Sequence, residues 1–432
     1  MDIEHLYQIY SESSGICTDS RNITPGSIFF ALKGEKFDGN RYAEEAVAKG
    51  CSCVVVDDDS LKGMNKHILV KNSLDTLQKL ANYHRRKLKI PMIAISGSNG
   101  KTTTKELIFY VLKKKFRVLA TQGNLNNHIG VPLTILSLKN EEIGIIEMGA
   151  NHKGEIKNLC KIAEPEFGII TNIGLAHLEG FGSPEGVIRG KMELYDFIKK
   201  NNGKVFFNSD NKLLSRLVME KEVDAVSYGS DRESICKGII ADKSRFLKIE
   251  LEFRDKMKTL IHTNLVGSYN LENIIAAAAI GRYFGVPVEN IRNAIENYTP
   301  SNNRSQYIQT EKNRIVLDAY NANPNSMTSS ILNFISLDEK DEKLFILGDM
   351  LELGKYSIQE HEKIIKLLRE NEIKNVFLIG SEFSQVSKNS PFNGFSNTEE
   401  LVDYIRLNPI KDHLILIKGS RGIKLEKVLE VL

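Results

Sequence analysis

Hydrophobic and polar positions alternate along the chain in a way that predicts short buried strands separated by helices. Continuous apolar runs occur at 28–32, 53–56, 92–95, 143–146, 167–170, 315–317, 344–347, 376–379 and 414–417. From the third run onward a helical pattern separates each run from the next, and such alternation favours parallel sheets with helices on both faces. The predicted fold class is therefore α/β.

Breaks in this pattern divide the chain into three predicted domains. At about one domain per 150 residues, a chain of 432 residues has room for about three. A basic stretch at 84–89 reads as one linker, and Pro300 with the polar residues 301–303 reads as another. We expect an N-terminal α/β domain at 1–87, a central domain with a mostly parallel sheet at 88–299, and a doubly wound domain at 300–432. The more polar segment 213–263 is expected to add antiparallel strands to the central domain.

Composition and charge exclude several classes of function. The net charge is +3, from 58 basic and 55 acidic residues, which is too small an excess for non-specific binding to nucleic acid or to a membrane surface. The five cysteines lack the spacing of zinc sites or disulfide frameworks. There is no signal-peptide pattern and no apolar run of about 18 residues. We therefore expect a monomeric cytoplasmic protein without a membrane span or a nucleic-acid partner.

The segment SGSNGKTTTKE is typical of a phosphate-binding loop, because it lies between a predicted strand and a predicted helix. Gly97 and Gly100 allow a tight turn whose N–H groups converge on phosphate oxygens. Lys101 is predicted to contact the β- and γ-phosphates, and the Thr102 hydroxyl to ligate Mg²⁺. Ile95 stands where the full pattern has glycine, so an ordinary glycine turn is the alternative. The predicted ATP contacts of this loop are Gly97, Ser98, Asn99, Gly100, Lys101, Thr102 and Thr103.

Two further polar residues follow predicted strands and so should lie near this loop. Glu147 ends one strand, and His177 follows the next. Ligands of α/β sheets bind at the carboxyl edge, where Glu147 could hold a hard cation. A solvated glutamate and a structural histidine are the alternatives, and Lys191 reads by default as a surface or phosphate-pairing lysine.

Sequence blocks along nearly the whole chain resemble the Mur ligase family. They are CTDSR with FFALKGEKFDGNRYAEEAVAKG, SGSNGKTTTKE, QGNLNNHIGVP, EMGANHKGEI, TNIGLAHLEGFGS with GKMEL, GSYNLEN, DAYNANPNS, GDMLELG and KGSRGIKLE. Each block alone is moderately specific, whereas all of them in order are highly specific. The resemblance implies an N-terminal domain for the UDP end of a substrate, a central ATPase, and a Rossmann-like C-terminal domain that closes over the site around 299–303.

The resemblance also implies a reaction and its cofactors. The reaction is ATP-dependent ligation of D-alanyl-D-alanine to UDP-N-acetylmuramoyl-tripeptide through an acyl phosphate, a step of peptidoglycan synthesis. The cofactors are ATP and Mg²⁺ at two sites. Lys191 corresponds to a lysine that is carbamylated in similar enzymes and that ligates the second Mg²⁺ with His177. The implied catalytic residues are Lys101, Glu147, His177 and Lys191, and the implied metal ligands are Thr102, Glu147, His177 and carbamylated Lys191.

Three sets of binding residues follow from the same resemblance. Further ATP contacts are Asn270, Asn273, Arg304, Asp318 and Tyr320. The UDP-sugar and peptide contacts are Thr18, Asp19, Ser20, Arg21, Lys33, Gly34, Asp38, Asn124, Asn126 and Asn127. The acceptor dipeptide contacts are Asn321, Asn323, Lys418, Ser420 and Arg421, with Ser326 capping the following helix. Without the resemblance these residues read as helix caps and polar turns, and Asn40, His128 and Asn303 depart from the family's pattern.

Two other functions fit parts of the sequence. Another Mur ligase or a folylpolyglutamate synthase would add an amino acid instead of a dipeptide, but DAYNANPNS and GDMLELG favour the dipeptide-adding type. A nucleotide-dependent switch with a protein partner fits the phosphate loop alone, since such a loop defines neither reaction nor substrate.

Overall fold

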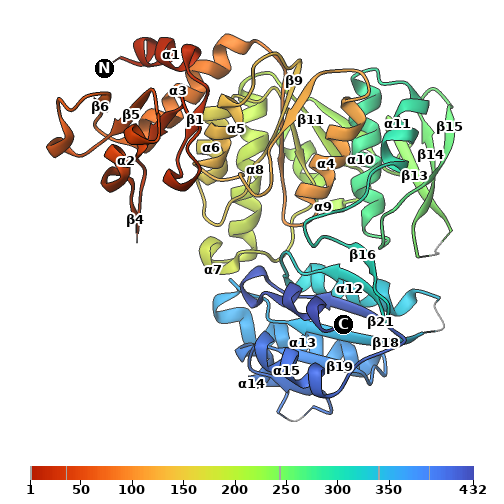
Figure 1. Cartoon of the computed structure of the whole chain (residues 1–432). Helices are drawn as coiled ribbons and strands as arrows, with labels where there is room; N and C mark the ends of the chain where they lie inside the picture. The colour runs from red at the N-terminus through yellow and green to blue at the C-terminus, as the bar shows by residue number, and fades with distance from the viewer. Residues whose placement is uncertain (1, 36, 243–244, 339–340, 389) are drawn as a thin grey trace.

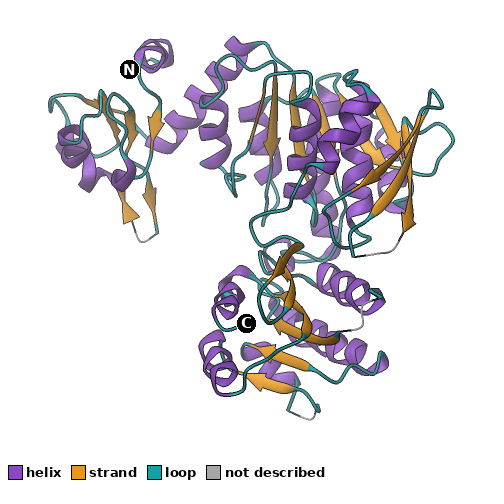
Figure 2. Cartoon of the chain, turned by 45° about the vertical axis from the view of Figure 1, so that its right-hand side comes forward, coloured by secondary structure: helices purple, strands orange, loops and turns teal. Residues whose placement is uncertain are grey.

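The computed structural model describes residues 2–35, 37–242, 245–338, 341–388 and 390–432. Figure 1 shows three parts, with the N-terminal part beside the central part and the C-terminal part below it. In the central and C-terminal parts, helices lie on both sides of the parallel strands, as Figure 2 shows. No helix in the described ranges combines the length and the apolar character needed to cross a bilayer. The predicted α/β class is confirmed.

The N-terminal part is built on a four-stranded parallel sheet in the order β1-β2-β5-β6. Its strands are β1 (Ile16–Cys17), β2 (Ile28–Phe30), β5 (Cys53–Val56) and β6 (His67–Leu69), and a separate hairpin is formed by β3 (Lys33–Gly34) and β4 (Phe37–Asp38). The helices are α1 (Ile3–Glu12) and α2 (Ala43–Ala48), with short 3₁₀ turns at Ser20–Asn22, Gly39–Tyr42 and Asp59–Leu61. Every residue of β2 and β5 is buried, as the apolar runs predict.

Helix α3 (Ser73–Leu88) joins this part to the central part and packs against α5 (Gly130–Leu136) and α6 (Glu155–Ala163). The interpretation of 84–89 as a linker was wrong, because all but the last of these residues continue the helix. His84 Nε2 lies 2.8 Å from the Leu138 carbonyl oxygen, and Arg85 donates to the Ala163 carbonyl at 2.8 Å. His84 and Arg85 are thus buried with partners, as polar groups inside a protein must be, whereas Arg86, Lys87 and Lys89 are exposed.

The central sheet has six parallel strands in the order β12-β11-β10-β7-β9-β8. They are β7 (Met92–Ser96), β8 (Val118–Ala120), β9 (Ile143–Glu147), β10 (Phe167–Ile170), β11 (Lys204–Asn208) and β12 (Ala225–Tyr228). The other helices of this part are α4 (Lys101–Leu112), α7 (Leu178–Phe181), α8 (Pro184–Lys200), α9 (Lys212–Lys221), α10 (Asn270–Tyr283) and α11 (Val288–Glu296). Ile93 and Ile95 join the apolar cluster of α4, α10 and α11, whereas Met92 and Ala94 join that of α5, α6 and α8. Successive strand side chains point to opposite faces, so both faces are covered.

The expected antiparallel extension is confirmed from residue 236 onward. Strands β13 (Cys236–Asp242), β14 (Lys248–Phe253) and β15 (Lys258–His262) form an antiparallel sheet beside α10. The part of the expectation that covered 213–235 was wrong, because α9 and the parallel strand β12 occupy most of that stretch. The alanines 276–279 are all buried, and their small side chains let α10 pack against α4 and β13.

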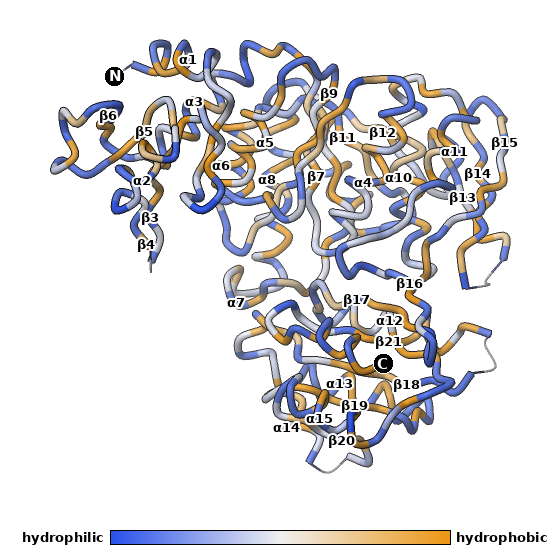
Figure 3. The backbone as a smooth tube through the Cα atoms, viewed as in Figure 1, coloured by the Kyte–Doolittle hydropathy of each residue, from blue (hydrophilic) through white to orange (hydrophobic). Residues whose placement is uncertain are grey.

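The C-terminal part has six strands in the order β16-β17-β21-β18-β19-β20, of which only β16 is antiparallel to its neighbour. They are β16 (Gln306–Gln309), β17 (Arg314–Asp318), β18 (Glu342–Gly348), β19 (Val376–Ile379), β20 (Asn393–Phe395) and β21 (His413–Lys418). The helices are α12 (Pro324–Ser336), α13 (Ser357–Glu370), α14 (Ser381–Val386) and α15 (Thr398–Leu407), with 3₁₀ turns at Gly354–Tyr356, Arg421–Ile423 and Leu425–Glu430. The four predicted strands are confirmed, and Figure 3 shows their hydrophobic character.

The chain enters the C-terminal part through residues in an uncommon backbone conformation. Asn302, Asn303 and Ser305 have φ angles of 59°, 57° and 47°. This left-handed region is rare for residues other than glycine, although asparagine adopts it more readily than most. Asn303 departs from the family's pattern, but an asparagine can still adopt the left-handed backbone conformation that this position has.

Candidate functional site

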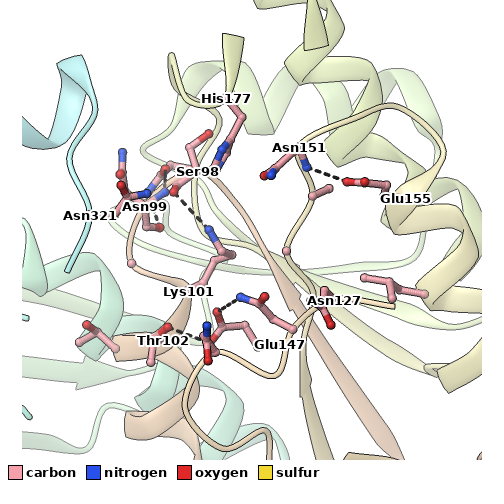
Figure 4. Close-up of a pocket in the computed structure, with 18 of the residues that line it drawn as sticks. Ser98, Asn99, Lys101, Thr102, Asn127, Glu147, Asn151, Glu155, His177 and Asn321 are labelled. Carbon is pink, nitrogen blue, oxygen red and sulfur yellow. Dashed lines mark hydrogen bonds between the residues drawn. The ribbon is translucent and has the colours of Figure 1, made fainter. Parts of the chain in front are cut away.

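A cleft of about 1410 Å³ lies where the central part meets the C-terminal part and α3. The sheet order explains its position, because β7 lies between β9 and β10 and their carboxyl ends open on the same side. The predicted residues that line it are Ser98, Asn99, Gly100, Lys101, Thr102, Thr103, Asn124, Asn126, Asn127, Glu147, His177, Asn270, Asn273, Arg304, Asp318, Tyr320, Asn321, Asn323, Ser326 and Lys418. Figure 4 shows several of them around one cavity.

The phosphate loop needs glycine at both predicted turns. Gly97 has a φ of 139° and Gly100 a φ of 77°. A Cβ atom at Gly97 would lie 2.0 Å from Thr171 Oγ1, and one at Gly100 would lie 2.5 Å from Asn273 Oδ1. Conformation and space therefore both exclude a side chain. The missing glycine at Ile95 does not matter locally, because Ile95 is a buried residue of β7.

The polar residues that follow β10 hold this loop in place. The Asn99 N–H donates to Asn172 Oδ1 at 2.9 Å, and the Thr171 hydroxyl donates to the Asn99 carbonyl at 2.6 Å. The Ser98 N–H donates to the Asn172 carbonyl at 3.0 Å. The sequence reasoning did not select Thr171 or Asn172, although two polar residues directly after a buried strand were the signal that could have found them. The loop is preorganised for an anion.

Lys101 folds back over the loop that precedes it. Its Nζ donates to the Gly97 carbonyl at 2.8 Å and to the Ser98 carbonyl at 3.3 Å. Burial lowers the pKa of Lys101 below its ordinary value, while the Glu147 carboxylate opposes this shift and the Arg304 charge adds to it. An anion in the cleft would be a stronger partner for this ammonium than neutral carbonyls are.

Glu147 and Thr102 form a small oxygen cluster at the base of the cleft (Figure 4). The Thr102 hydroxyl donates to Glu147 Oε2 at 2.8 Å, and Asn126 Nδ2 donates to Glu147 Oε1 at 2.8 Å. The buried Lys105 Nζ lies 4.0 Å from Glu147 Oε2 and donates to the Thr121 carbonyl at 2.7 Å. The alternative of a solvated glutamate was wrong, because Glu147 is only 1% exposed.

The oxygen cluster fits a Mg²⁺ ion that is shared with a nucleotide. Mg²⁺ prefers hard oxygen ligands and usually binds one or two protein groups together with phosphates and water. Thr102 and Glu147 supply such oxygens. Across the described ranges, no group of three or more His, Cys, Asp or Glu residues could enclose a metal on its own. The donor set therefore fits an ion that arrives with phosphate.

Lys191 lies behind the cleft wall on α8 and is only 1% exposed. Its Nζ lies 3.5 Å from the Ala150 carbonyl oxygen and 5.5 Å from the centroid of the Phe181 ring. Burial, with a smaller contribution from the Lys101 charge, lowers the pKa of the Lys191 ammonium to about 7. The default interpretation as a surface lysine was wrong. A buried amine that is partly uncharged near neutral pH can act as a nucleophile.

His177 lines the cleft and contacts a side chain of the C-terminal part. Its Nδ1 atom hydrogen-bonds to Glu352, and this bond lowers the pKa of the Glu352 carboxyl. Glu352 was not predicted as a site residue. Neither were Asn151 and Glu155, which lie on the wall between β9 and α6 and are joined by a hydrogen bond of 2.7 Å from the Asn151 N–H. All three lie within blocks that carried the family resemblance.

Asn323 connects the C-terminal part to the phosphate loop. Its Nδ2 donates to Asn99 Oδ1 at 2.7 Å, and its Oδ1 accepts from the Ser326 N–H at 3.0 Å. Asn323 is therefore the N-cap of α12, and Ser326 completes a capping box from three residues further on. Ser326 thus takes part in capping α12, as predicted, but from the third helical position, where its Oγ accepts from the Asn323 N–H at 3.1 Å.

Arg304 and Tyr320 line the cleft from the C-terminal side and stack on each other. The Arg304 guanidinium lies 3.4 Å from the centroid of the Tyr320 ring, and Arg421 lies 5.5 Å from the same centroid. Deeper in the wall, Lys418 Nζ donates to Asp318 Oδ2 at 2.6 Å. The two predicted ligand contacts Lys418 and Asp318 are thus paired with each other.

Asn270 and Asn273 lie in the first turn of α10, and both are buried. Asn273 Oδ1 accepts from the Thr104 hydroxyl at 3.0 Å, and Asn273 Nδ2 donates to Asn270 Oδ1 at 2.9 Å. The alternative of a helix cap was wrong, because Tyr269 occupies the N-cap position without a side-chain capping bond. The pair ties α10 to α4 beside the phosphate loop.

Several predicted residues do not line the cleft in this arrangement. They are Thr18, Asp19, Ser20, Arg21, Lys33, Gly34, Asp38, Gly97, Lys191, Ser420 and Arg421. In the N-terminal part, Asp19 pairs with Arg21 at 2.7 Å and Lys33 pairs with Asp57 at 3.0 Å. Ser420 accepts from the Leu351 N–H at 2.9 Å and so supports a turn. A role for the N-terminal set in UDP-sugar binding stays a prediction.

Comparisons with known proteins cover the whole chain. Residues 12–88 match the Mur ligase family catalytic domain, 95–281 the Mur ligase middle domain, and 303–421 the glutamate ligase domain of Mur ligases. The UDP-N-acetylmuramoyl-tripeptide–D-alanyl-D-alanine ligase of Bacillus subtilis (strain 168) is 33% identical over 427 residues, which span 96% of this chain and 92% of that protein.

Two solved structures are also similar over their whole length. The crystal structure of MurF from Acinetobacter baumannii has a TM-score of 0.87 and 29% identity, covering 98% of this chain and 97% of that one. The MurF ligase from Thermotoga maritima, crystallised in complex with ADP, has a TM-score of 0.86 and 28% identity with the same coverage. Together with the phosphate loop and the cleft, these matches show that the chain belongs to the Mur ligase family.

Proposed function

We propose that this protein is the ligase that joins D-alanyl-D-alanine to UDP-N-acetylmuramoyl-tripeptide with conversion of ATP to ADP and phosphate. The relatives that match nearly the whole chain carry this name. The observation that carries the proposal is that Lys101, Glu147 and His177, from separate segments of the central part, line one cleft with residues of the C-terminal part. The product is the pentapeptide precursor of peptidoglycan.

The phosphate loop and its neighbours bind and orient the ATP phosphates. The backbone of the loop and the N-terminus of α4 favour negative charge, and Lys101 can turn from its carbonyl partners to a phosphate oxygen. Thr102 and Glu147 would hold the Mg²⁺ ion, which supplies positive charge that stabilises the transferring phosphoryl group. Arg304 and Asp318 are proposed to contact the nucleotide from the C-terminal side.

The reaction then follows from charge and leaving-group chemistry. The terminal carboxylate of the tripeptide attacks the γ-phosphorus, which forms a C–O–P bond, breaks the bond to ADP, and makes an acyl phosphate. The amine of the dipeptide attacks the acyl carbon, loses a proton and expels phosphate. No nucleophilic side chain is required, so the protein contributes by positioning both substrates, by stabilising charge and by excluding water.

Lys191 is proposed to be carbamylated and to complete a second Mg²⁺ site with His177. Carbamylation joins CO₂ to a neutral amine and releases a proton, which turns a cation into an anion. The burial of Lys191 and its lowered pKa support this step, because they favour the neutral amine. Among the described residues, the unmodified Lys191 Nζ is held by the Ala150 carbonyl at 3.5 Å and by the face of the Phe181 ring, neither of which carries a negative charge.

The division of labour among the domains is also proposed. Residues 1–87 would bind the UDP end of the donor, 88–299 would bind ATP, and 300–432 would bring the acceptor, with Asn321, Asn323, Lys418, Ser420 and Arg421 near the dipeptide. Asn124, Asn126 and Asn127 would contact the peptide of the donor, and Asn126 already contacts Glu147. We also propose that the protein acts in the cytoplasm as a monomer.

A coupled assay of ADP and phosphate release tests this function. UDP-N-acetylmuramoyl-tripeptide and ATP are supplied with D-alanyl-D-alanine, with single amino acids, or without an acceptor. Release and pentapeptide formation are expected only with the dipeptide. Activity with a free amino acid would point to another Mur ligase reaction, and ATP hydrolysis controlled by a protein partner would point to a switch.

A further inference from the structure

The C-terminal part supplies a carboxylate that holds one side of the His177 ring. Glu352 follows β18, and one of its carboxylate oxygens hydrogen-bonds to His177 Nδ1. A carboxylate can only accept hydrogen bonds, so Nδ1 is the nitrogen that carries the hydrogen. In the neutral ring, Nε2 then carries the free lone pair. A carboxylate behind a histidine commonly sets its tautomer and ring orientation in this way.

The backbone around both residues favours this contact. His177 has a φ of 53° and Glu352 a φ of 63°, both in the left-handed region that residues other than glycine rarely adopt. The Glu179 N–H donates to the Glu352 carbonyl at 3.3 Å. Such backbone conformations persist only where surrounding contacts maintain them, and they are concentrated at functional sites.

A second side chain of the C-terminal part holds the same turn. Asn325 Oδ1 accepts a hydrogen bond from the Leu175 N–H at 2.9 Å. The turn that carries His177 is therefore held by three hydrogen bonds to two residues of the other domain, Glu352 and Asn325. Its geometry depends on how the C-terminal domain is seated, whereas Glu147 is held by Thr102 and Asn126 within the central domain.

We propose that Glu352 is a positioning residue that sets the tautomer and orientation of His177 when the C-terminal domain is seated. The histidine then presents Nε2 to the cleft only in the closed arrangement. The carboxylate of the tripeptide is therefore phosphorylated only when the C-terminal domain, which brings the acceptor dipeptide, is in place. This inference rests on the proposed function, since it assigns His177 to the ligase reaction.

The substitution Glu352→Gln tests the inference in the full-length protein. A glutamine has the same shape but lacks the charge and can donate as well as accept, so it no longer dictates which ring nitrogen carries the hydrogen. We expect kcat to fall by about 10- to 100-fold, with the KM for ATP changed by less than about twofold. In ¹⁵N-histidine spectra with ADP and without Mg²⁺, His177 should lose its single Nδ1–H tautomer, because no metal on Nε2 then holds the hydrogen on Nδ1.

The matched control is Glu370→Gln, which removes the same charge from an exposed position on α13, where Glu370 pairs with Lys366 at 3.7 Å. It should change neither kcat nor the His177 spectrum. In a His177→Asn background, Glu352→Gln should cause no further loss, because both changes act through the same ring. Thermal unfolding of each variant reports whether it folds, and Glu352→Asp provides a second variant that keeps the charge and should retain the tautomer.

Three results would overturn the inference. They are wild-type kcat in Glu352→Gln, a lower kcat with an unchanged His177 tautomer, and additive losses in the double variant. In each of these cases the wild-type protein still ligates the dipeptide, so the proposed function stands. A wild-type protein that forms no pentapeptide would reject the proposed function, and this inference with it.

Discussion

The two walls of the cleft are held together in different ways. On the nucleotide side, the phosphate loop, Glu147 and Lys191 are all fixed by contacts inside the central part. The C-terminal wall meets them through a few side-chain hydrogen bonds, of which Asn323 to Asn99 is one. We infer from this difference that the nucleotide-side wall is preorganised for phosphoryl transfer. The C-terminal wall determines when the transfer occurs, because it must first be seated against the other wall.

The largest effect is expected from Lys101→Ala, on the preorganised wall. Loss of the ammonium removes the charge nearest the loop, and removal of one such preorganised group typically costs at least about 10²- to 10³-fold in rate. Pentapeptide formation should fall at least that far while the fold is kept, as shown by an unchanged unfolding temperature. Activity within tenfold of wild type would mean that the loop does not bind the reacting phosphate.

A smaller effect is expected when the pH is changed, because the rate of carbamylation of Lys191 should fall about tenfold for each pH unit below the pKa of this residue. Its pKa is lowered to about 7, so the neutral amine predominates above pH 7 and decreases about tenfold for each pH unit below it. Incorporation of ¹³CO₂ held at the same dissolved concentration at both pH values, followed by NMR, should therefore be faster at pH 8 than at pH 6. The Lys191→Met variant should show no such signal, and equal rates at both pH values would contradict the neutral-amine requirement.

On the wall that closes, Asn323→Ala should have two separable consequences. Loss of the N-cap of α12 should lower the free energy of unfolding by about 1 kcal/mol. Loss of the bond to Asn99 should lower kcat/KM by roughly three- to tenfold, since such a hydrogen bond contributes about 0.5–1.5 kcal/mol.

Asn397→Ala provides the matched control for this prediction. Asn397 caps α15 in the same domain, with its side chain accepting from the Glu400 N–H at 2.9 Å. It should lose similar stability in denaturant unfolding without any change in kcat/KM. Equal kinetic losses in both variants would mean that the effect of Asn323 is only structural.

The smallest effect is expected at the connection between the walls. Asn303→Gly should change activity by less than about twofold, because glycine adopts the left-handed conformation at no steric cost. A β-branched valine at this position should destabilise the protein by about 1–2 kcal/mol. Thermal unfolding and kcat/KM measured for both variants test this, and a large kinetic loss with glycine would indicate that the Asn303 side chain itself has a role.

Within the preorganised wall, sequence patterns predicted the loop and Glu147, but not the burial of Lys191 or the contacts made by Thr171 and Asn172. The strand at 92–95 and the two glycines of the loop are neighbours in sequence, so their geometry depends on local conformation. The position of Glu147 follows from the rule that polar residues at the carboxyl ends of parallel strands meet at one edge of the sheet. The C-terminal contacts could not be predicted in the same way. Glu352 and His177 are 175 positions apart, and no periodicity relates them. Sequence patterns also misjudged 84–89, where His84 and Arg85 are buried against backbone carbonyls that only the tertiary fold brings near.

Helix α3 has a practical consequence for anyone who wishes to express or exchange the N-terminal module. Leu77, Leu80 and Ala81 are fully buried, and the helix packs against α5 and α6. A fragment that stops at residue 87 would expose to water the part of this apolar stripe that packs on α5 and α6, at up to about 1.5–3 kcal/mol for each leucine uncovered, which favours aggregation. Chimeras between relatives are better spliced just ahead of Asn72, which caps α3, so that the helix stays with the body on which it rests.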